Sequence, residues 1–143
     1  CLSNSGSMWC WGADEMGQLG DGPGSPTSCA GSPCASSPTE IPGVAPIYVL
    51  GIGPATTCAT SPLQCWGDGR DGQMADGRRE GRDAPGRVAT VFVAISVAVG
   101  SRHVCAAAGD GELYCWGDND HGQLGNGTTD DQVTPTAVSP TAR

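Results

Sequence analysis

Cysteine is the residue type with the most evident chemistry in this chain. Eight cysteines occur among 143 residues. So many cysteines in a short chain favour a disulfide framework, and with it an oxidising compartment. Zinc is the rival chemistry, but the cysteines do not form two Cys-x-x-Cys knuckles and the chain has only 2 histidines, so the spacing disfavours a metal site.

Six of the cysteines form three similar pairs, and the second member of each pair opens a Cys-Trp-Gly triplet: Cys1 and Cys10, Cys58 and Cys65, Cys105 and Cys115. Each pair flanks a short turn. If these segments are β-hairpins, the paired cysteines lie opposite each other at a Cα separation of about 4.5 to 5.5 Å, which suits a disulfide. We therefore expect one disulfide per hairpin, and another between Cys29 and Cys34.

The cysteine pairs belong to a longer repeat. Successive Cys-Trp-Gly triplets are 55 and 50 residues apart, a period typical of propeller blades. Each triplet is followed by a Gly-Gln motif, at 17–20, 72–75 and 122–125, and then by a proline and a valine. Apolar residues alternate with small ones ahead of Gly53 and Gly100, as in a strand with one buried face. The pattern predicts β structure throughout.

The repeat divides the chain into three units, expected at 1–57, 58–104 and 105–143. The first unit carries an insertion at 21–40 that is rich in Ser, Pro and Gly and is pinned by its own cysteine pair. The third unit lacks the apolar last strand of the others, and the first begins without a strand to precede it. We therefore expect incomplete blades at both ends.

The order of Cys-Trp-Gly, Gly-Gln-Leu-Gly and Pro-x-x-Val resembles that of the regulator of chromosome condensation repeat family, and the resemblance covers nearly the whole chain. It implies an all-β fold of tandem four-stranded antiparallel propeller blades. About three blades are too few to close a ring of roughly four to eight, so we expect an incomplete or shared ring, or an open assembly. In family members with a nuclear role, one face promotes nucleotide exchange on a small GTPase. Other members share only the scaffold.

Tryptophan follows the second cysteine in every unit, as Trp11, Trp66 and Trp116. A large flat side chain repeated at one position is expected to pack between neighbouring blades, burying roughly 150 to 250 Å² each time. Trp9 departs from the repeat, because Gln64 and Tyr114 stand at its position. Trp9 is therefore the candidate surface contact.

The charge pattern disfavours a nucleic-acid partner. The net charge is -8, from 15 acidic and 7 basic residues, and phosphate binding needs basic patches. The arginines between Arg70 and Arg87 are expected to be a solvated loop rather than a binding site. No apolar run is long enough for a membrane span, and no signal peptide opens the sequence. A lipidated Cys1 is the alternative, but it would leave Cys10 without a partner.

Little in the sequence indicates catalysis or a cofactor. Neither His103 nor His121 has a nucleophile next to it, so we expect no catalytic residues. Acidic loops such as 118–120 resemble part of a calcium loop, but a glycine occupies the fifth position of the EF-hand pattern, so we expect no metal. Asn126 opens a glycosylation sequon, which has meaning only in a host that glycosylates asparagine.

The leading hypothesis is a non-enzymatic extracellular module, secreted or at the cell surface, for binding or adhesion. It would present loops, foremost the insertion at 21–40, to a protein or to a surface glycan. The alternative is a structural subunit that completes its terminal blades by self-association, head to tail, into an extracellular filament. Guanine-nucleotide exchange ranks third, because it calls for a complete ring in a nuclear or cytosolic protein.

Overall fold

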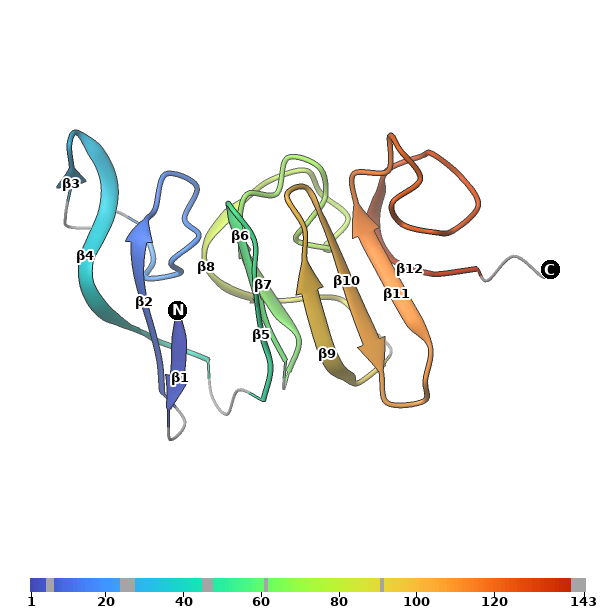
Figure 1. Ribbon diagram of the computed structural model, residues 1–143, viewed down its shortest axis with the longest axis horizontal. Helices are drawn as coiled ribbons and strands as arrows, with labels where there is room; N and C mark the ends of the chain where they lie inside the picture. Colours follow the sequence, from blue (N-terminus) through green and yellow to red (C-terminus); the bar gives the residue numbers. More distant parts are fainter. Residues whose placement is uncertain (5–6, 24–27, 45–47, 61, 91, 140–143) are drawn as a thin grey trace.

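The computed structural model describes residues 1–4, 7–23, 28–44, 48–60, 62–90 and 92–139. This part of the chain forms twelve β-strands and no helix. The strands make three four-stranded antiparallel sheets that follow one another along the long axis of the molecule (Figure 1). The prediction of an all-β fold of tandem blades is confirmed. Within the described residues no helix has the length and apolar character to cross a bilayer.

We call the sheets blades 1, 2 and 3 in chain order. Blades 2 and 3 are simple meanders, in which each strand pairs with the next along the chain. Blade 2 comprises β5 (Leu50–Ile52), β6 (Thr56–Ala59), β7 (Gln64–Gly67) and β8 (Arg82–Arg87). Blade 3 comprises β9 (Ala94–Val99), β10 (His103–Ala108), β11 (Leu113–Gly117) and β12 (Gln132–Ala137).

Blade 1 has a different strand order, β1-β2-β4-β3. Its members are β1 (Leu2–Asn4), β2 (Ser7–Ala13), β3 (Ser28–Cys29) and β4 (Ser32–Ile41). β4 pairs with β2 as β8 pairs with β7, and β3 adds a short strand at the outer edge. Among the described residues, blade 1 has no counterpart of β5 or β9.

The unit boundaries expected from the repeat are shifted in the structure. β5 and β9, which we had placed at the ends of units 1–57 and 58–104, pair with the hairpin that follows them. The reason is local, because tight turns join each strand to its successor: Gly53 N–H donates to the Thr56 carbonyl, and Gly100 N–H to the His103 carbonyl, each at 2.8 Å. The unit expected at 105–143 therefore does not lack a strand, since β9 completes its sheet.

The insertion expected at 21–40 is also mostly strand. Its second half forms β4, with Thr39 opposite Cys10 and Ala35 opposite Gly12. β2 would otherwise expose a row of unpaired backbone groups on that side. Only the part around β3 is peculiar to blade 1, and residues 24–27 within it lie outside the described residues.

All eight cysteines are joined in four disulfides, with no free cysteine. Cys58 stands directly opposite Cys65 in the register of blade 2, and Cys105 opposite Cys115 in blade 3. The Cα separation is 4.1 Å in both, and 3.9 Å between Cys1 and Cys10. Cys29 and Cys34, at 5.7 Å, link β3 to β4.

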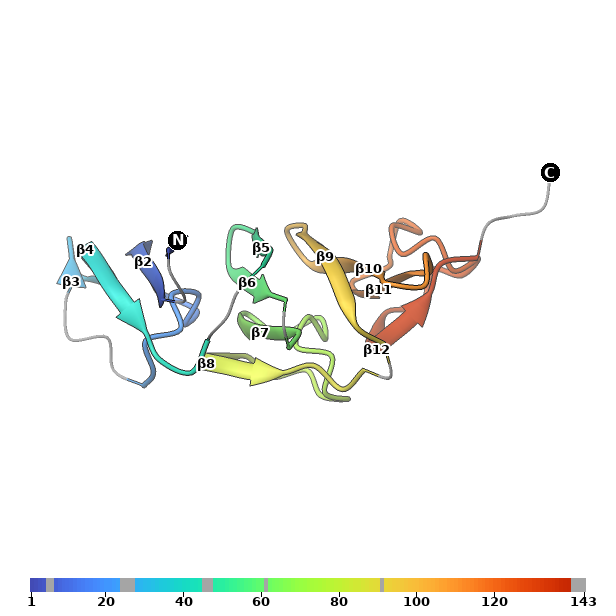
Figure 2. The same ribbon diagram turned by 90° about the horizontal axis from the view of Figure 1, so that it is seen from below.

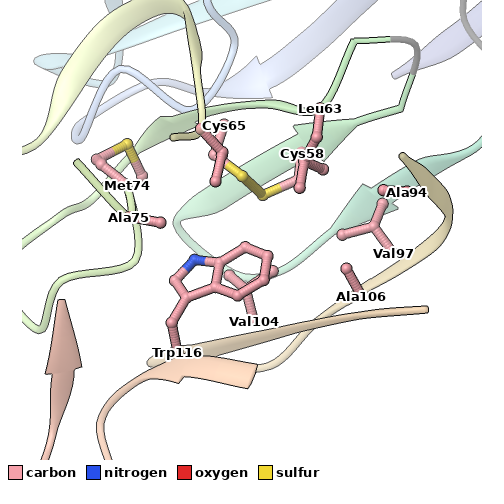
Figure 3. Packing of buried hydrophobic residues seen from close by; sticks show 11 residues of the cluster. Cys58, Leu63, Cys65, Met74, Ala75, Ala94, Val97, Val104, Ala106 and Trp116 are labelled. Atoms are coloured by element: carbon pink, nitrogen blue, oxygen red, sulfur yellow. A yellow bond between two sulfur atoms is a disulfide. The ribbon is translucent and has the colours of Figure 1, made fainter. Parts of the chain in front are cut away.

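The apolar cores lie between the blades. Seen after a turn of 90°, the three sheets stand side by side in a row (Figure 2). We call the contact between blades 1 and 2 the first seam, and that between blades 2 and 3 the second seam. One cluster fills each seam, and in the second the Trp116 ring lies against the side of blade 2 that carries the Cys58–Cys65 disulfide (Figure 3).

Candidate functional site

Each seam is built around a tryptophan of the second blade of the pair. Trp66 of β7 is fully buried, and its Nε1–H donates to the main-chain carbonyl of Gln18 in blade 1 at 3.0 Å. Trp116 of β11 is also fully buried, and its Nε1–H donates to the carbonyl of Gln73 in blade 2 at 2.8 Å. A tryptophan at this position thus docks on the Gly-Gln loop of the preceding blade.

The glutamine of each Gly-Gln loop has its side chain folded back on its own loop. Gln18 Oε1 accepts the Met16 N–H at 2.9 Å, and Gln73 Oε1 accepts the Asp71 N–H at 2.8 Å. Gln123 repeats this with His121, at 2.9 Å. In the two seams, the main-chain oxygen of the glutamine accepts the hydrogen bond from the tryptophan of the next blade. Three identical glutamines were the signal for this role, which the sequence analysis did not use.

A glycine makes room for the indole. A Cβ at Gly20 would lie 2.5 Å from Trp66 Nε1, and the backbone there has a φ of +82°. Both the close approach and the positive φ favour glycine. Ala75 occupies the same place in blade 2, with a φ of 53°, and is fully buried in the core beneath Trp116.

Trp11 has no such partner. It is 41% exposed, and we find no hydrogen bond to its indole within the described residues. Of the three tryptophans expected between blades, Trp66 and Trp116 lie in the seams, whereas Trp11 faces solvent because no described blade precedes it. Trp9 is 39% exposed and stands two residues before Trp11 on β2, so both lie on the same side of the strand.

A hollow of ≈ 560 Å³ lies beside Trp11. Its wall comes from β2 and from the cysteine-pinned segment, and includes Trp11, Glu15, Cys29, Pro33, Cys34 and Ser36. In blade 2 the corresponding side receives a loop of the preceding blade, with Gly22 N–H donating to the Asp83 carbonyl at 2.8 Å. The hollow and the two tryptophans form the open face of blade 1, and this face is the candidate binding site.

The arginines are largely neutralised by carboxylates. Arg70 pairs with Asp68, Arg79 with Asp131, Arg82 with Asp76, and Arg102 with Asp71, at 2.7 to 2.9 Å. Two of these pairs, Arg79–Asp131 and Arg102–Asp71, cross the second seam. Such pairs hold orientation more than they add stability. They also leave these arginines less available to phosphate.

Three carboxylates of blade 3, Asp118, Asp120 and Asp131, come within 4.8 Å of one another and could hold a cation. Two of these carboxylates, Asp118 and Asp131, are already paired with protein groups. Asp131 accepts the Asn119 N–H at 2.8 Å and the Arg79 guanidinium at 2.9 Å, and these bonds lower the pKa of Asp131. Asp118 lies 3.5 Å from Arg102. The acidic loop therefore acts as a structural cap for blade 3.

The third blade decides the family. Two models described as the regulator of chromosome condensation (RCC1) repeat match the sequence, one over residues 94–123 and the other over 110–143. Blade 3 is a repeat of the regulator of chromosome condensation family. The blades and seams described above are the structural form that this repeat takes here. No curated protein matches the sequence significantly.

Three solved structures resemble nearly the whole chain in fold. Prp20p from Saccharomyces cerevisiae has a TM-score of 0.81 at 23% identity, covering 98% of this chain and 36% of that one. The yeast protein bound to Kap60 gives 0.81 at 22%, covering 94% and 33%. Human WBSCR16 gives 0.76 at 23%, covering 97% and 36%. The repeat chain thus spans about a third of these neighbours, and the likeness is one of fold.

Proposed function

We propose that this chain is a non-enzymatic, extracellular protein-binding module that binds through the open face of blade 1. Four disulfides support an oxidising setting. The fold supports a protein partner, because the solved neighbour Prp20p is described as binding Gsp1p and histones, and Kap60 is bound to the same yeast protein.

The observation that carries the proposal is the chemistry of the two filled seams. There the tryptophan N–H meets a main-chain carbonyl in a glycine-flanked loop. Trp11 offers the same donor beside a hollow of ≈ 560 Å³. A protein loop with an outward carbonyl fits this face better than a glycan, which has no peptide carbonyl at a tight bend. We therefore place protein ahead of glycan.

A peptide tests this idea directly. A cyclic peptide with the sequence of residues 122–127 is titrated into the chain, and tryptophan fluorescence is followed. We expect saturable binding that Trp11→Ala abolishes and that Tyr48→Ala, a change at a 76% exposed side chain, leaves unaltered. Binding that survives Trp11→Ala, or no binding to the wild-type chain, would remove the open face from consideration.

A second candidate is head-to-tail assembly into an extracellular filament. Blade 3 carries the complement of the open face, since Gln123 has the same loop geometry as Gln18 and Gln73 and, within the described part of the chain, no donor meets its carbonyl. Blade 1 thus presents the Trp11 indole N–H as a donor, and blade 3 presents the Gln123 carbonyl as an acceptor. A contact between these different surfaces of two chains is heterologous, and repeating it adds one chain after another. Sedimentation velocity should show growth with concentration that Trp11→Ala stops, and negative-stain images should show threads. A single small particle at all concentrations contradicts assembly.

A further inference from the structure

Blade 1 contains a carboxyl pair where blade 3 contains an amide pair. Asp14 and Asn119 occupy the same place in their blades, as do Asp21 and Asn126. Asp14 Oδ1 accepts the Leu19 N–H at 2.9 Å, as Asn119 Oδ1 accepts the Leu124 N–H at 3.0 Å. The loops therefore share one geometry but differ in the groups that they place inside it.

The amide pair in blade 3 is complementary. Asn119 Nδ2–H donates to Asn126 Oδ1 at 3.2 Å, and further to the carbonyls of Thr128 and Asp130. Blade 2 has only one carboxyl at these two positions. Gly69 stands where blade 3 has Asn119, and Asp76, where blade 3 has Asn126, accepts a hydrogen bond from Arg82 at 2.8 Å. In blade 1 the corresponding side chains, Asp14 and Asp21, are both carboxyls that interact with each other, so neither supplies an amide donor.

The carboxyl pair is enclosed. Asp14 is only 6% exposed. Asp21 Oδ1 is buried and, among the described residues, no N–H or hydroxyl donates to it. A buried acceptor without a donor is destabilising, because the oxygen has lost its water and gained no partner. One proton on Asp14 would supply the missing donor, because a neutral carboxyl donates through its O–H to the facing oxygen.

The charges around Asp14 also favour the neutral form. Burial raises its pKa, as do the facing Asp21 and the negative charge of Asp83 on β8, while the Leu19 N–H opposes the shift. Glu15, from the same loop, and Arg82, from β8, line the adjoining crevice, but Arg82 is engaged by Asp76 and by the Met74 carbonyl. From β4 the crevice receives the uncharged Pro33.

We propose that the Asp14 carboxyl holds a proton against Asp21, so that the first seam is closed while Asp14 is protonated and loosens when Asp14 ionises. The pair lies at the seam itself, because Gly22, next to Asp21, donates its N–H to the Asp83 carbonyl of blade 2 at 2.8 Å. Two facing carboxylates, with Asp83 beside them, would repel one another across this contact. The second seam has no such pair in the described residues.

The direction of the pH effect follows from the proton count. Because the pKa of Asp14 is raised above 3.8, the folded chain retains a proton that the open form loses. The stabilisation is complete below the ordinary pKa and is lost as the pH rises through the raised value. The opening equilibrium of the seam should grow by at most about tenfold per pH unit across this window and then level off.

Amide hydrogen exchange of Gly22, corrected for the intrinsic rate, measures this opening directly. The wild-type chain should lose protection as the pH rises across the window, whereas Asp14→Asn, which restores the amide of blade 3, should keep protection constant. Asp83→Asn should move the midpoint to lower pH. Glu15→Gln is the matched control, since it removes a carboxylate from the same crevice and should leave the dependence intact. The Asp14 carboxyl carbon, followed by NMR, should titrate above 3.8.

Three results would overturn the proposed proton on Asp14. These are a flat wild-type profile, a profile that Asp14→Asn does not flatten, and a wild-type profile that calcium chloride flattens and EDTA restores. In the last case a divalent cation, rather than a proton, would neutralise the carboxyl pair.

Discussion

The indole nitrogen of Trp116 lies 2.8 Å from the main-chain oxygen of Gln73, and both groups are buried between two blades. Trp66 makes the corresponding bond to Gln18, but there Thr57 Oγ1 donates to the same oxygen at 2.9 Å. At this bond the two seams share one design and differ in the second donor. That difference allows the bond to be tested by comparison.

Trp116→Phe should destabilise the chain more than Trp66→Phe. The first change leaves the Gln73 carbonyl buried and unpaired, at a cost of about 1 to 3 kcal/mol, whereas Thr57 still satisfies Gln18 after the second. Urea unfolding of both variants gives the two free energies of unfolding. Adding Thr57→Val to Trp66→Phe should make the losses similar. Equal losses in the single variants would contradict the role of Thr57.

Gly20→Ala should weaken the first seam. The new Cβ would lie 2.5 Å from Trp66 Nε1, and forcing atoms into a packed site costs about 1 to 3 kcal/mol. Gly22→Ala is the control, because Gly22 also has a positive φ, +94°, but a Cβ there meets nothing within 4 Å. In thermal unfolding, the Gly20→Ala variant should have a lower Tm than the Gly22→Ala variant. The reverse order would show that backbone strain at a positive φ, rather than the clash with Trp66, determines the loss of stability.

Replacing both Cys58 and Cys65 by alanine should cost about 2 to 3 kcal/mol from lost cross-linking, and more because both sulfurs pack in the core of the second seam. The double replacement of Cys29 and Cys34 should cost less, since that bridge spans a sequence separation of 5 rather than 7. Urea unfolding measures both. Free thiols at Cys58, Cys65, Cys105 and Cys115 in native protein, seen by mass spectrometry, would contradict the framework.

Acid should loosen the cap of blade 3. The Asn119 N–H and Arg79 lower the pKa of Asp131 below 3.8. The ionised Asp131 therefore stabilises the folded chain at a pH above 3.8, and this stabilisation is lost as the pH falls through the lowered pKa. Asp131→Asn should remove this part of the acid sensitivity, measured by thermal unfolding over a pH series. Asp130→Asn leaves both bonds in place and should behave as wild type.

The sequence was sufficient to predict what the repeat itself fixes. Three copies of Cys-Trp-Gly indicated the blades and pointed to tryptophan between them, as Trp66 and Trp116 now show. The strand assignment of Leu50–Ile52 was harder, because an apolar stretch does not reveal which neighbouring hairpin it joins. Trp11 is 41% exposed in the described chain, and a residue type in a repeat does not say whether a preceding blade covers it.

The carboxyl pair escaped the sequence analysis for a different reason. Asp14 and Asp21 look like ordinary polar loop residues, and Asp21 follows the Gly-Gln motif as Asp76 does. Only the hydrogen bonds of Asn119 in blade 3 show that these positions face each other inside the loop. Comparing the blades position by position, with that contact known, would have identified the pair.

The inward fold of the glutamine side chain has an evolutionary consequence. The polar contact between blades joins an indole to a peptide oxygen, and a peptide oxygen is the same whatever sequence surrounds it. Neighbouring modules therefore need no matched side-chain code at this bond. A gene encoding such modules can therefore duplicate, delete or reorder them, and each new pair of neighbours can still form this hydrogen bond. The other positions of each module are then free to diverge in sequence.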